Sequence, residues 1–304
     1  MTHFVLRLIS KLAVSCIMLV LLVMTFGQAL PQDDEIVFSA HQRNGIYRMA
    51  LHRGIIAPFI STKNRLVQPD WSPDGRHIAY VDSTSAQLEL YIADADGRNQ
   101  QLLTKLPTSS DYDPQWSPDG RFIVYSASTT ADGNTHEIDV MLFDTRTQVK
   151  RRLTTTNIFR EHMLSWSPDG TEIAFVLYSP DHHNSDIFGI NVESGTIDGL
   201  ISTADNDEYP VWSHDGRFIV FVSGDVQRGL YLLDVTTQHT SLLYTLTGVF
   251  SPSDWSQDSR YIYFTLAYHI YKLDVSSCMQ SPKSCVPELL VRGGEDARRK
   301  PVSP

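Results

Sequence analysis

Basic residues are scarce in this chain. Among its 304 residues, 25 Lys and Arg stand against 35 Asp and Glu, which gives a formal net charge of −10 at pH 7. Proteins hold the phosphates of nucleic acids largely with Lys and Arg, and the sequence shows no stripe of basic and aromatic residues. A glycine-rich phosphate loop is also missing. We therefore expect no nucleic acid among the partners and no nucleotide-dependent activity.

Catalytic motifs are missing as well. The sequence contains no Gly-x-Ser-x-Gly elbow, the turn that carries the nucleophile of α/β hydrolases. No other recognisable nucleophile motif takes its place. The sequence therefore predicts a protein that is not an enzyme, requires no cofactor and acts by binding.

Cysteine occurs only three times. Cys16 lies in the apolar segment near the N-terminus, so only Cys278 and Cys285 remain in the rest of the chain. The Ser, Gln and Pro residues around them are typical of a hairpin loop, and two such thiols pair in an oxidising compartment. The alternative is a metal site, for which two thiols without a nearby histidine supply half of a tetrahedral ligand set. We predict the disulfide.

Long apolar runs are absent after the first thirty residues. Arg7 and Lys11 precede an uncharged stretch, residues 12–26, and the small-x-small sequence Gly27-Gln28-Ala29 follows it. This order is typical of a signal peptide, here residues 1–29, and the stretch is shorter than the roughly 20 residues that span a bilayer. The alternative is an uncleaved leader whose residues 12–27 anchor the protein in a membrane.

Either reading of the leader predicts an exported protein, periplasmic or extracellular, that meets a membrane only through an uncleaved N-terminal segment. Residues 30–35 then form a short linker to the folded domain.

A turn of the form Trp-Ser-x-Asp recurs five times and uses all five tryptophans of the protein. Successive copies lie 43 to 50 residues apart, which is close to the length of one four-stranded propeller blade. Proline presets the first dihedral of such a turn, aspartate bonds the neighbouring backbone, and tryptophan can fill the wedge between blades. We assign structural roles to the tryptophans and aspartates of the repeat: Trp71, Trp116, Trp166, Trp212 and Trp255, with Asp74, Asp119, Asp169, Asp215 and Asp258.

Strands follow each of these turns. A short β-branched and aromatic segment such as Ile78-Ala79-Tyr80-Val81 comes first, and a second one such as Leu90-Tyr91-Ile92-Ala93 comes next. A fourth strand such as Gln101-Leu102-Leu103-Thr104 completes the repeat, so a helical solenoid is excluded.

Residues 36–49 match the middle strands of a repeat without a tryptophan turn, and this partial copy brings the number of repeats to six. The sequence thus predicts an all-β fold, a six-bladed β-propeller of four-stranded blades over residues 36–292, preceded by the signal or anchor helix. Residues 293–304 form a tail that can close the ring, and Pro301-Val302-Ser303 faintly resembles Pro210-Val211-Trp212-Ser213.

Repeats of Trp-Ser-Pro-Asp-Gly followed by Ile-Ala-Tyr or Ile-Val-Tyr resemble those of the TolB-type propellers, a WD-repeat-like family. The resemblance covers residues 36–292 and implies a periplasmic protein that docks proteins or peptides. TolB carries an α/β domain before its propeller, whereas the first strand expected here begins at Ile36. This departure argues against a TolB role in the Tol system.

In a propeller, the loops between blades and those between second and third strands share one face, here called the loop-rich face. The opposite face, here called the turn face, carries the Trp-Ser-x-Asp turns. Acidic and aromatic residues gather in the loop-rich segments, where they can hold a cation or a basic peptide. We expect a protein, peptide or other envelope ligand to bind there, and the candidate residues are Tyr112, Asp113, Glu161, His162, Glu208 and Tyr209.

A second hypothesis is a metal-dependent, carbohydrate-active propeller enzyme that resembles oligogalacturonate lyases. It requires three or more side chains to converge on one divalent cation. The histidines available on the loop-rich segments are His136, His162, His182 and His183. Sequence alone leaves the existence of a metal site open.

Overall fold

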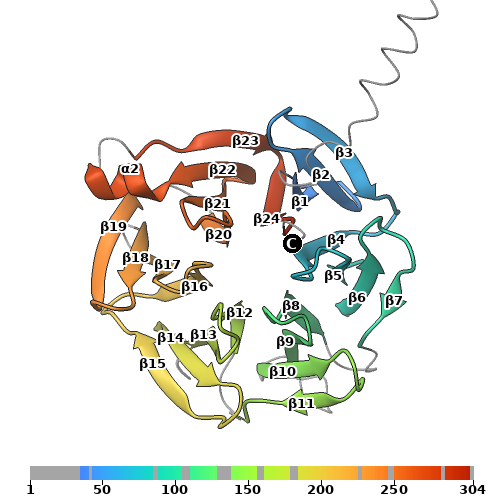
Figure 1. Ribbon diagram of the computed structural model, residues 1–304, viewed down its shortest axis with the longest axis horizontal. Helices are drawn as coiled ribbons and strands as arrows, with labels where there is room; N and C mark the ends of the chain where they lie inside the picture. Colours follow the sequence, from blue (N-terminus) through green and yellow to red (C-terminus); the bar gives the residue numbers. More distant parts are fainter. Residues whose placement is uncertain are drawn as a thin grey trace, which may run out of the picture. The chain divides into compact units, whose positions relative to one another are not determined.

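The computed structural model describes residues 35–40, 43–84, 88–104, 110–128, 138–155, 161–178, 184–224, 228–245, 250–281 and 285–301. In this part of the chain, strands β1 to β24 form six separate sheets of four antiparallel strands. Figure 1 shows the sheets as blades around a central axis. The fold is a six-bladed β-propeller, as the repeat predicts. The expected N-terminal helix lies outside the described residues.

Each blade is given from the central axis outward. Blade 1 consists of β24 (Gly294–Arg299), β1 (Glu35–Ala40), β2 (Ile46–Ala50) and β3 (Ile55–Ile60). Blade 2 consists of β4 (Leu66–Trp71), β5 (His77–Asp82), β6 (Glu89–Asp94) and β7 (Gln101–Leu102). Blade 3 consists of β8 (Asp111–Trp116), β9 (Phe122–Ser128), β10 (Ile138–Asp144) and β11 (Lys150–Arg152).

The other three blades follow the same order. Blade 4 consists of β12 (Glu161–Trp166), β13 (Glu172–Tyr178), β14 (Ser185–Asn191) and β15 (Ile197–Ile201). Blade 5 consists of β16 (Asp207–Trp212), β17 (Phe218–Ser223), β18 (Gly229–Asp234) and β19 (His239–Thr245). Blade 6 consists of β20 (Phe250–Trp255), β21 (Tyr261–Leu266), β22 (His269–Asp274) and β23 (Glu288–Arg292), with helix α2 (Val275–Gln280) between β22 and β23.

The ring is closed by strands from both ends of the chain. The innermost strand of blade 1 is β24, which pairs with β1 through Ile36 opposite Arg299 and Ala40 opposite Gly294. This strand falls within the segment 293–304 and ends before Pro301, so the resemblance at Pro301-Val302-Ser303 does not mark the closing strand. Strand β24 instead occupies the place that a tryptophan-bearing strand has in the other blades.

The Trp-Ser-x-Asp turn is a compact hydrogen-bonded unit. In blade 2 the hydroxyl of Ser72 donates to Asp74 Oδ1 at 2.6 Å, and the same carboxylate oxygen accepts the backbone N–H of Arg76 at 3.0 Å. Gly75 has a positive φ of 64°, which favours glycine at this position. The same serine-to-aspartate bond forms in the other four turns, at Asp119, Asp169, Asp215 and Asp258.

The hydrophobic core lies between the blades. Trp116 packs with Ala79 and Val81 of blade 2 and with Ile123 of its own blade. Trp255 is fully buried between blades 5 and 6, whereas Trp212 is only partly buried. Because each tryptophan contacts the preceding blade, the repeat supplies the packing that joins neighbouring sheets.

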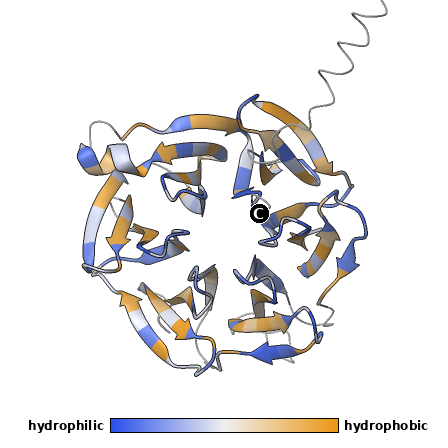
Figure 2. Cartoon of the chain, in the orientation of Figure 1, coloured by the Kyte–Doolittle hydropathy of each residue, from blue (hydrophilic) through white to orange (hydrophobic). Residues whose placement is uncertain are grey.

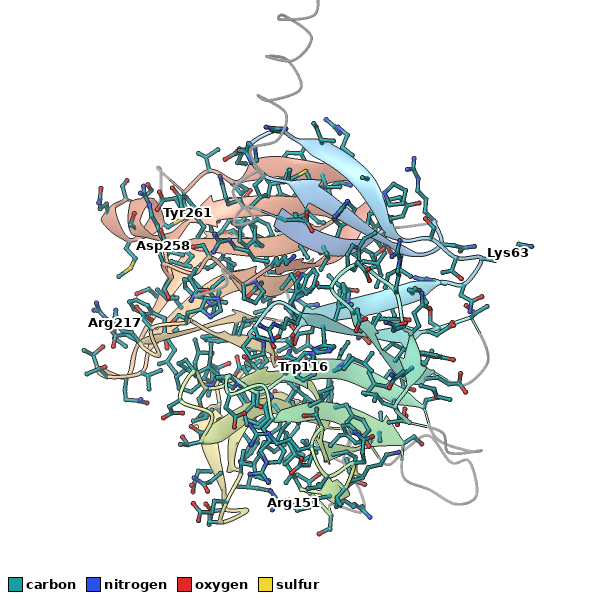
Figure 3. All side chains as sticks on the ribbon, turned by 45° about the vertical axis from the view of Figure 1, so that its right-hand side comes forward. Lys63, Trp116, Arg151, Arg217, Asp258 and Tyr261 are labelled. Carbon is teal, nitrogen blue, oxygen red and sulfur yellow. A yellow bond between two sulfur atoms is a disulfide. The ribbon has the colours of Figure 1, made fainter. Side chains whose placement is uncertain are left out.

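The connections between strands lie on the two faces of the ring that the strand order predicts. On the turn face, Thr145 N donates to Arg121 O at 2.9 Å and joins the two turns of blade 3. On the loop-rich face, Ser128 N donates to Ser110 O at 3.0 Å. Figure 3 shows Arg217, Asp258 and Tyr261 at one side of the ring and Lys63, from an inter-blade loop, at the opposite side.

Arginine–aspartate pairs recur on the turn face. Arg121 Nη2 lies 2.9 Å from Asp144 Oδ2, and its guanidinium lies 4.7 Å from the centroid of the Phe122 ring. Equivalent pairs join Arg217 to Asp234 and Arg260 to Asp274. Each pair ties the start of a second strand to the end of a third strand.

Helix α2 and the following loop are linked by a disulfide between Cys278 and Cys285. The side chain of Asp274 caps the helix by accepting the backbone N–H of Ser277. Among the residues that the structure describes, none of the helices has the length and apolar character needed to cross a membrane.

Candidate functional site: the central channel

The six innermost strands line a central channel. One cavity of about 340 Å³ lies toward the turn face, and a second of about 110 Å³ lies toward the loop-rich face. Gln115, Val211, Ser253 and Arg298 line both cavities, so the two meet within the ring. Figure 2 shows β24 as a hydrophilic strand beside the channel.

Every innermost strand that follows an inter-blade loop carries a β-bulge near its middle. The ladder between β8 and β9 shifts register between Tyr112 and Gln115, and the ladder between β16 and β17 shifts between Glu208 and Val211. A bulge inserts an unpaired residue and bends the strand. The third residue of five innermost strands has a positive φ: Gln68, Asp113, Met163, Tyr209 and Asp296.

These left-handed residues all line the cavity at the loop-rich face. A positive φ is uncommon for residues other than glycine, and strained residues of this kind cluster at functional sites. In β20 the corresponding residue is Pro252, whose ring fixes a negative φ. The bulges thus give the mouth of the channel at this face a regular ring of side chains.

Hydrogen bonds connect this ring from blade to blade. Asp296 Oδ2 accepts the backbone N–H of Gln68 at 3.4 Å, and Gln68 Oε1 accepts the N–H of Asp113 at 3.1 Å. Asp113 Oδ2 in turn accepts the N–H of Met163 at 3.1 Å. Gln68 Nε2 also donates to Asp113 Oδ1. Polar side chains at the third position therefore satisfy backbone donors that the bulges free.

Further polar residues lie deeper in the channel, at the position one residue before the tryptophan of each innermost strand. Asp70 has this position in β4, and Arg298 has it in β24, where Arg299 replaces the tryptophan. Arg298 Nε lies 3.2 Å from Asp70 Oδ1, while Asp70 Oδ2 accepts the backbone N–H of Trp116 at 2.8 Å. Burial raises the pKa of Asp70 to about 7, although Arg298 acts in the opposite direction. In the ring at the mouth, burial and then the charge of the neighbouring Glu295 raise the pKa of Asp296. The channel therefore combines several carboxylates with the guanidinium of Arg298.

A model of the TolB beta propeller domain matches residues 25–163 of this chain. The six four-stranded blades extend the same architecture around the whole ring. The chain is a six-bladed β-propeller that is similar to the TolB beta propeller domain over residues 25–163. It is 31% identical over 48 residues to the Tol-Pal system protein TolB of Hydrogenovibrio crunogenus, a segment that covers 16% of this chain and 11% of that relative.

Solved TolB structures share the fold of this TolB-like propeller at low sequence identity. TolB from Acinetobacter baumannii superposes with a TM-score of 0.73 at 17% identity, over 88% of this chain and 67% of the other. A putative TolB from Agrobacterium tumefaciens superposes with a TM-score of 0.66 at 17% identity, over 88% of this chain and 92% of the other. At this identity the likeness shows the fold alone.

The TolB-like ring places the sequence-derived candidates at equivalent strand positions. Asp113 and Tyr209 are third residues and line the same cavity at the loop-rich face. Tyr112 and Glu208 precede them as second residues. Burial, and after it the charge of Glu208, raises the pKa of Tyr209.

Glu208 does not stand free at the mouth. Its carboxylate accepts the hydroxyl of Tyr178 at 2.8 Å and forms an ion pair with Arg228. Glu161 and His162 begin β12, where His162 has the strand position of Tyr112 and Glu208, and their side chains lie outside the described residues. Asp113 and Tyr209 are thus the two candidates that the structure brings to one cavity.

The four histidines considered as metal ligands fall on parts of the chain that the structure does not describe. His136, His182 and His183 lie outside the described residues, as does the side chain of His162. Within the described ranges, no group of three His, Cys, Asp or Glu residues is arranged to hold a metal ion.

The sequence did not point to two polar residues of the ring at the channel mouth. Gln68 and Asp296 belong to the same ring as Asp113. Gln68 could have been found, because it stands three residues before Trp71, as Asp113 stands before Trp116 and Tyr209 before Trp212. Asp296 is hidden because β24 has Arg299 where the other strands have tryptophan.

Proposed function

We propose that this TolB-like propeller is an exported, non-catalytic scaffold that binds a protein or peptide partner in the cell envelope through its loop-rich face. The observation that carries the proposal is the size and composition of the channel mouth. The mouth itself holds about 110 Å³, below the roughly 300–1,000 Å³ of pockets that enclose small ligands, and it continues into the cavity of about 340 Å³ toward the turn face. Such a mouth suits the insertion of one side chain from a partner that lies across the face.

Charge favours a basic side chain as the inserted group. Asp113, Asp296 and Arg298 line the mouth, so two carboxylates face one guanidinium there, and the whole chain has a formal charge of −10. A cleft with an excess of one charge attracts ligands of the opposite sign. Tyr209, on the same cavity, offers a ring that an ammonium or guanidinium group can contact.

The matched family model and the curated relative are named for TolB, and neither name specifies a reaction. The curated relative is named a Tol-Pal system protein, and this chain matches 11% of its length. The sequence carries no catalytic motif. No contact among the described residues favours the lyase-like alternative.

Affinity capture from envelope extracts tests this proposal. The variant Asp113→Asn/Asp296→Asn removes two charges from the mouth and keeps oxygen acceptors for the backbone N–H groups of Met163 and Gln68. A matched control, Glu193→Gln/Asp198→Asn, removes two charges from exposed positions on the turn face. We expect the mouth variant to lose the partner and the control to retain it. Equal capture by both variants contradicts a binding site at the mouth.

Export has its own test. Cell fractionation followed by mass measurement of the protein should place it outside the cytoplasm with its N-terminus near residue 30. Recovery of the intact chain in the membrane fraction would instead support the anchor formed by residues 12–27. An intact chain in the cytoplasm contradicts export.

A further inference from the structure

A groove of about 770 Å³ lies at the seam where blade 6 meets blade 1. It opens at the loop-rich face, because it is bordered by the β1–β2 hairpin and by the link from β23 to β24. It shares no lining residue with the two channel cavities. Its apolar walls come from Phe38, Tyr47, Ile56, Pro58 and Val291, and its basic residues are Arg43 and Arg292.

The groove exists because the seam has an unusually short connection. Gly293 alone links β23 to β24, whereas residues 61–65 link β3 to β4 and residues 202–206 link β15 to β16. Gly293 has a φ of 72°, and a Cβ at Gly294 would lie 2.7 Å from Ile270 Cδ1. The chain therefore turns tightly here and brings no side chain of its own to cover the seam.

The walls of the groove are graded from buried to exposed. Phe38 and Val291 are almost fully buried, whereas Ile56 is 46% exposed at the outer edge of blade 1. The rings of Phe38 and Tyr47 stack with centroids 6.1 Å apart. Pro58 stands two residues after Ile56 on β3, on the same side of the strand, and continues this apolar wall. An elongated apolar group would be in contact with protein along its length.

The two arginines supply charge at the edge of this apolar surface. Both side chains are exposed, and neither forms an ion pair with the residues that the structure describes. A guanidinium binds carboxylate and phosphate groups through paired hydrogen bonds. The volume of the groove also falls within the range of small-ligand pockets.

We propose that this groove binds an amphiphilic anion: an unbranched alkyl chain on the apolar walls, ending in a carboxylate or phosphate at Arg43 and Arg292. This site is separate from the channel mouth and does not depend on the function proposed there. The groove would then be filled when an anionic amphiphile is present around the protein and empty when it is absent.

Calorimetric titration of the full chain with octanoate, octyl phosphate and octanol tests the proposal. We expect at least one of the two anions to bind about tenfold or more tightly than octanol, since two charge-assisted contacts are added. Arg43→Gln/Arg292→Gln should remove this preference and leave the binding of octanol unchanged. Ile56→Gln should weaken all three ligands.

The matched control is Arg53→Gln/Arg76→Gln, which removes two exposed arginines outside the groove and should bind like the unmodified protein. Thermal unfolding of each variant checks that the fold is retained. Equal affinities for octanol and both anions, or unchanged anion binding in Arg43→Gln/Arg292→Gln, would overturn the proposal. So would the absence of saturable binding of either anion.

Discussion

Arg298 of the C-terminal strand forms an ion pair with Asp70 of blade 2, with Arg298 Nε 3.2 Å from Asp70 Oδ1. On the other side of the same strand, Asp254 Oδ2 of blade 6 accepts the backbone N–H of Arg299 at 2.8 Å. The strand that closes the ring is therefore held by one carboxylate from each neighbouring blade. This arrangement makes the stability of closure depend on groups inside the channel.

At about pH 8, above the pKa of about 7 of Asp70, Arg298→Met should destabilise the protein by roughly 3 kcal/mol, because the buried carboxylate of Asp70 loses its cation. Asp70→Asn in the Arg298→Met background should restore much of that loss, since the uncompensated charge is gone. Urea unfolding of both single variants and the double variant measures the coupling. Strictly additive losses would show that the two side chains do not act as a pair.

Stability should fall as pH rises through neutrality. Burial raises the pKa of Asp70 from its ordinary 3.8 to about 7, so the folded state binds this proton more tightly than the unfolded state. The resulting stabilisation is complete below about pH 4 and is lost as pH rises through about 7. Between about pH 5.5 and about pH 8, Asp70 should lower the free energy of unfolding by roughly 2 kcal/mol.

Asp70→Asn should flatten that pH dependence, as measured by urea unfolding across the same range. Asp111, whose pKa burial raises to about 6, changes stability in the same direction and remains in this variant. A partial reduction of the slope is therefore expected. An unchanged slope in Asp70→Asn would assign the effect to other groups.

The tryptophans of the repeat should differ in their contribution to stability. Trp255 is 0% exposed, and its indole N–H donates to Val211 O at 3.1 Å, so Trp255→Ala should cost roughly 3–5 kcal/mol. Trp212 is only partly buried, and Trp212→Ala should cost less. Chemical denaturation gives both values. A loss below about 1 kcal/mol for Trp255→Ala contradicts the packing between blades.

The disulfide should stabilise blade 6 by limiting the freedom of the unfolded chain. Cys278 and Cys285 enclose a short loop, for which about 2–3 kcal/mol is expected. Cys278→Ser/Cys285→Ser should show that loss in urea unfolding, and reductant should lower the stability of the unmodified protein alone. A reductant effect on the double variant as well would point to another cause.

The repeat made the fold readable from sequence, because tryptophan, serine, aspartate and glycine recur with one period and each has a local role. The identity of the closing strand was less accessible. Strand β24 reads Gly-Glu-Asp-Ala-Arg-Arg, without the tryptophan or the apolar residues by which the other strands are recognised. Its place is set by pairing with β1 and by the carboxylates of Asp70 and Asp254.

Only part of the candidate site could be predicted from the sequence, because loop position does not show which side chains line the channel. Loop position suggested both Asp113 and Glu208, yet only a structure shows that Asp113 lines the channel while Glu208 is bound by Arg228 and Tyr178. Asp113 is the third residue of β8 and Glu208 the second residue of β16, and neighbouring positions of a strand face different surroundings. The groove at the seam follows from the length of one link and has no sequence motif.

Site-specific photo-crosslinking in living cells reports which face of the propeller meets a partner. A benzophenone side chain is placed at Tyr112, beside the channel mouth on the loop-rich face, and in a second strain at exposed Asp198 on the turn face. We expect a partner adduct from position 112 and none from position 198. Adducts from position 198 alone, or equal yields from both, would contradict binding at the loop-rich face.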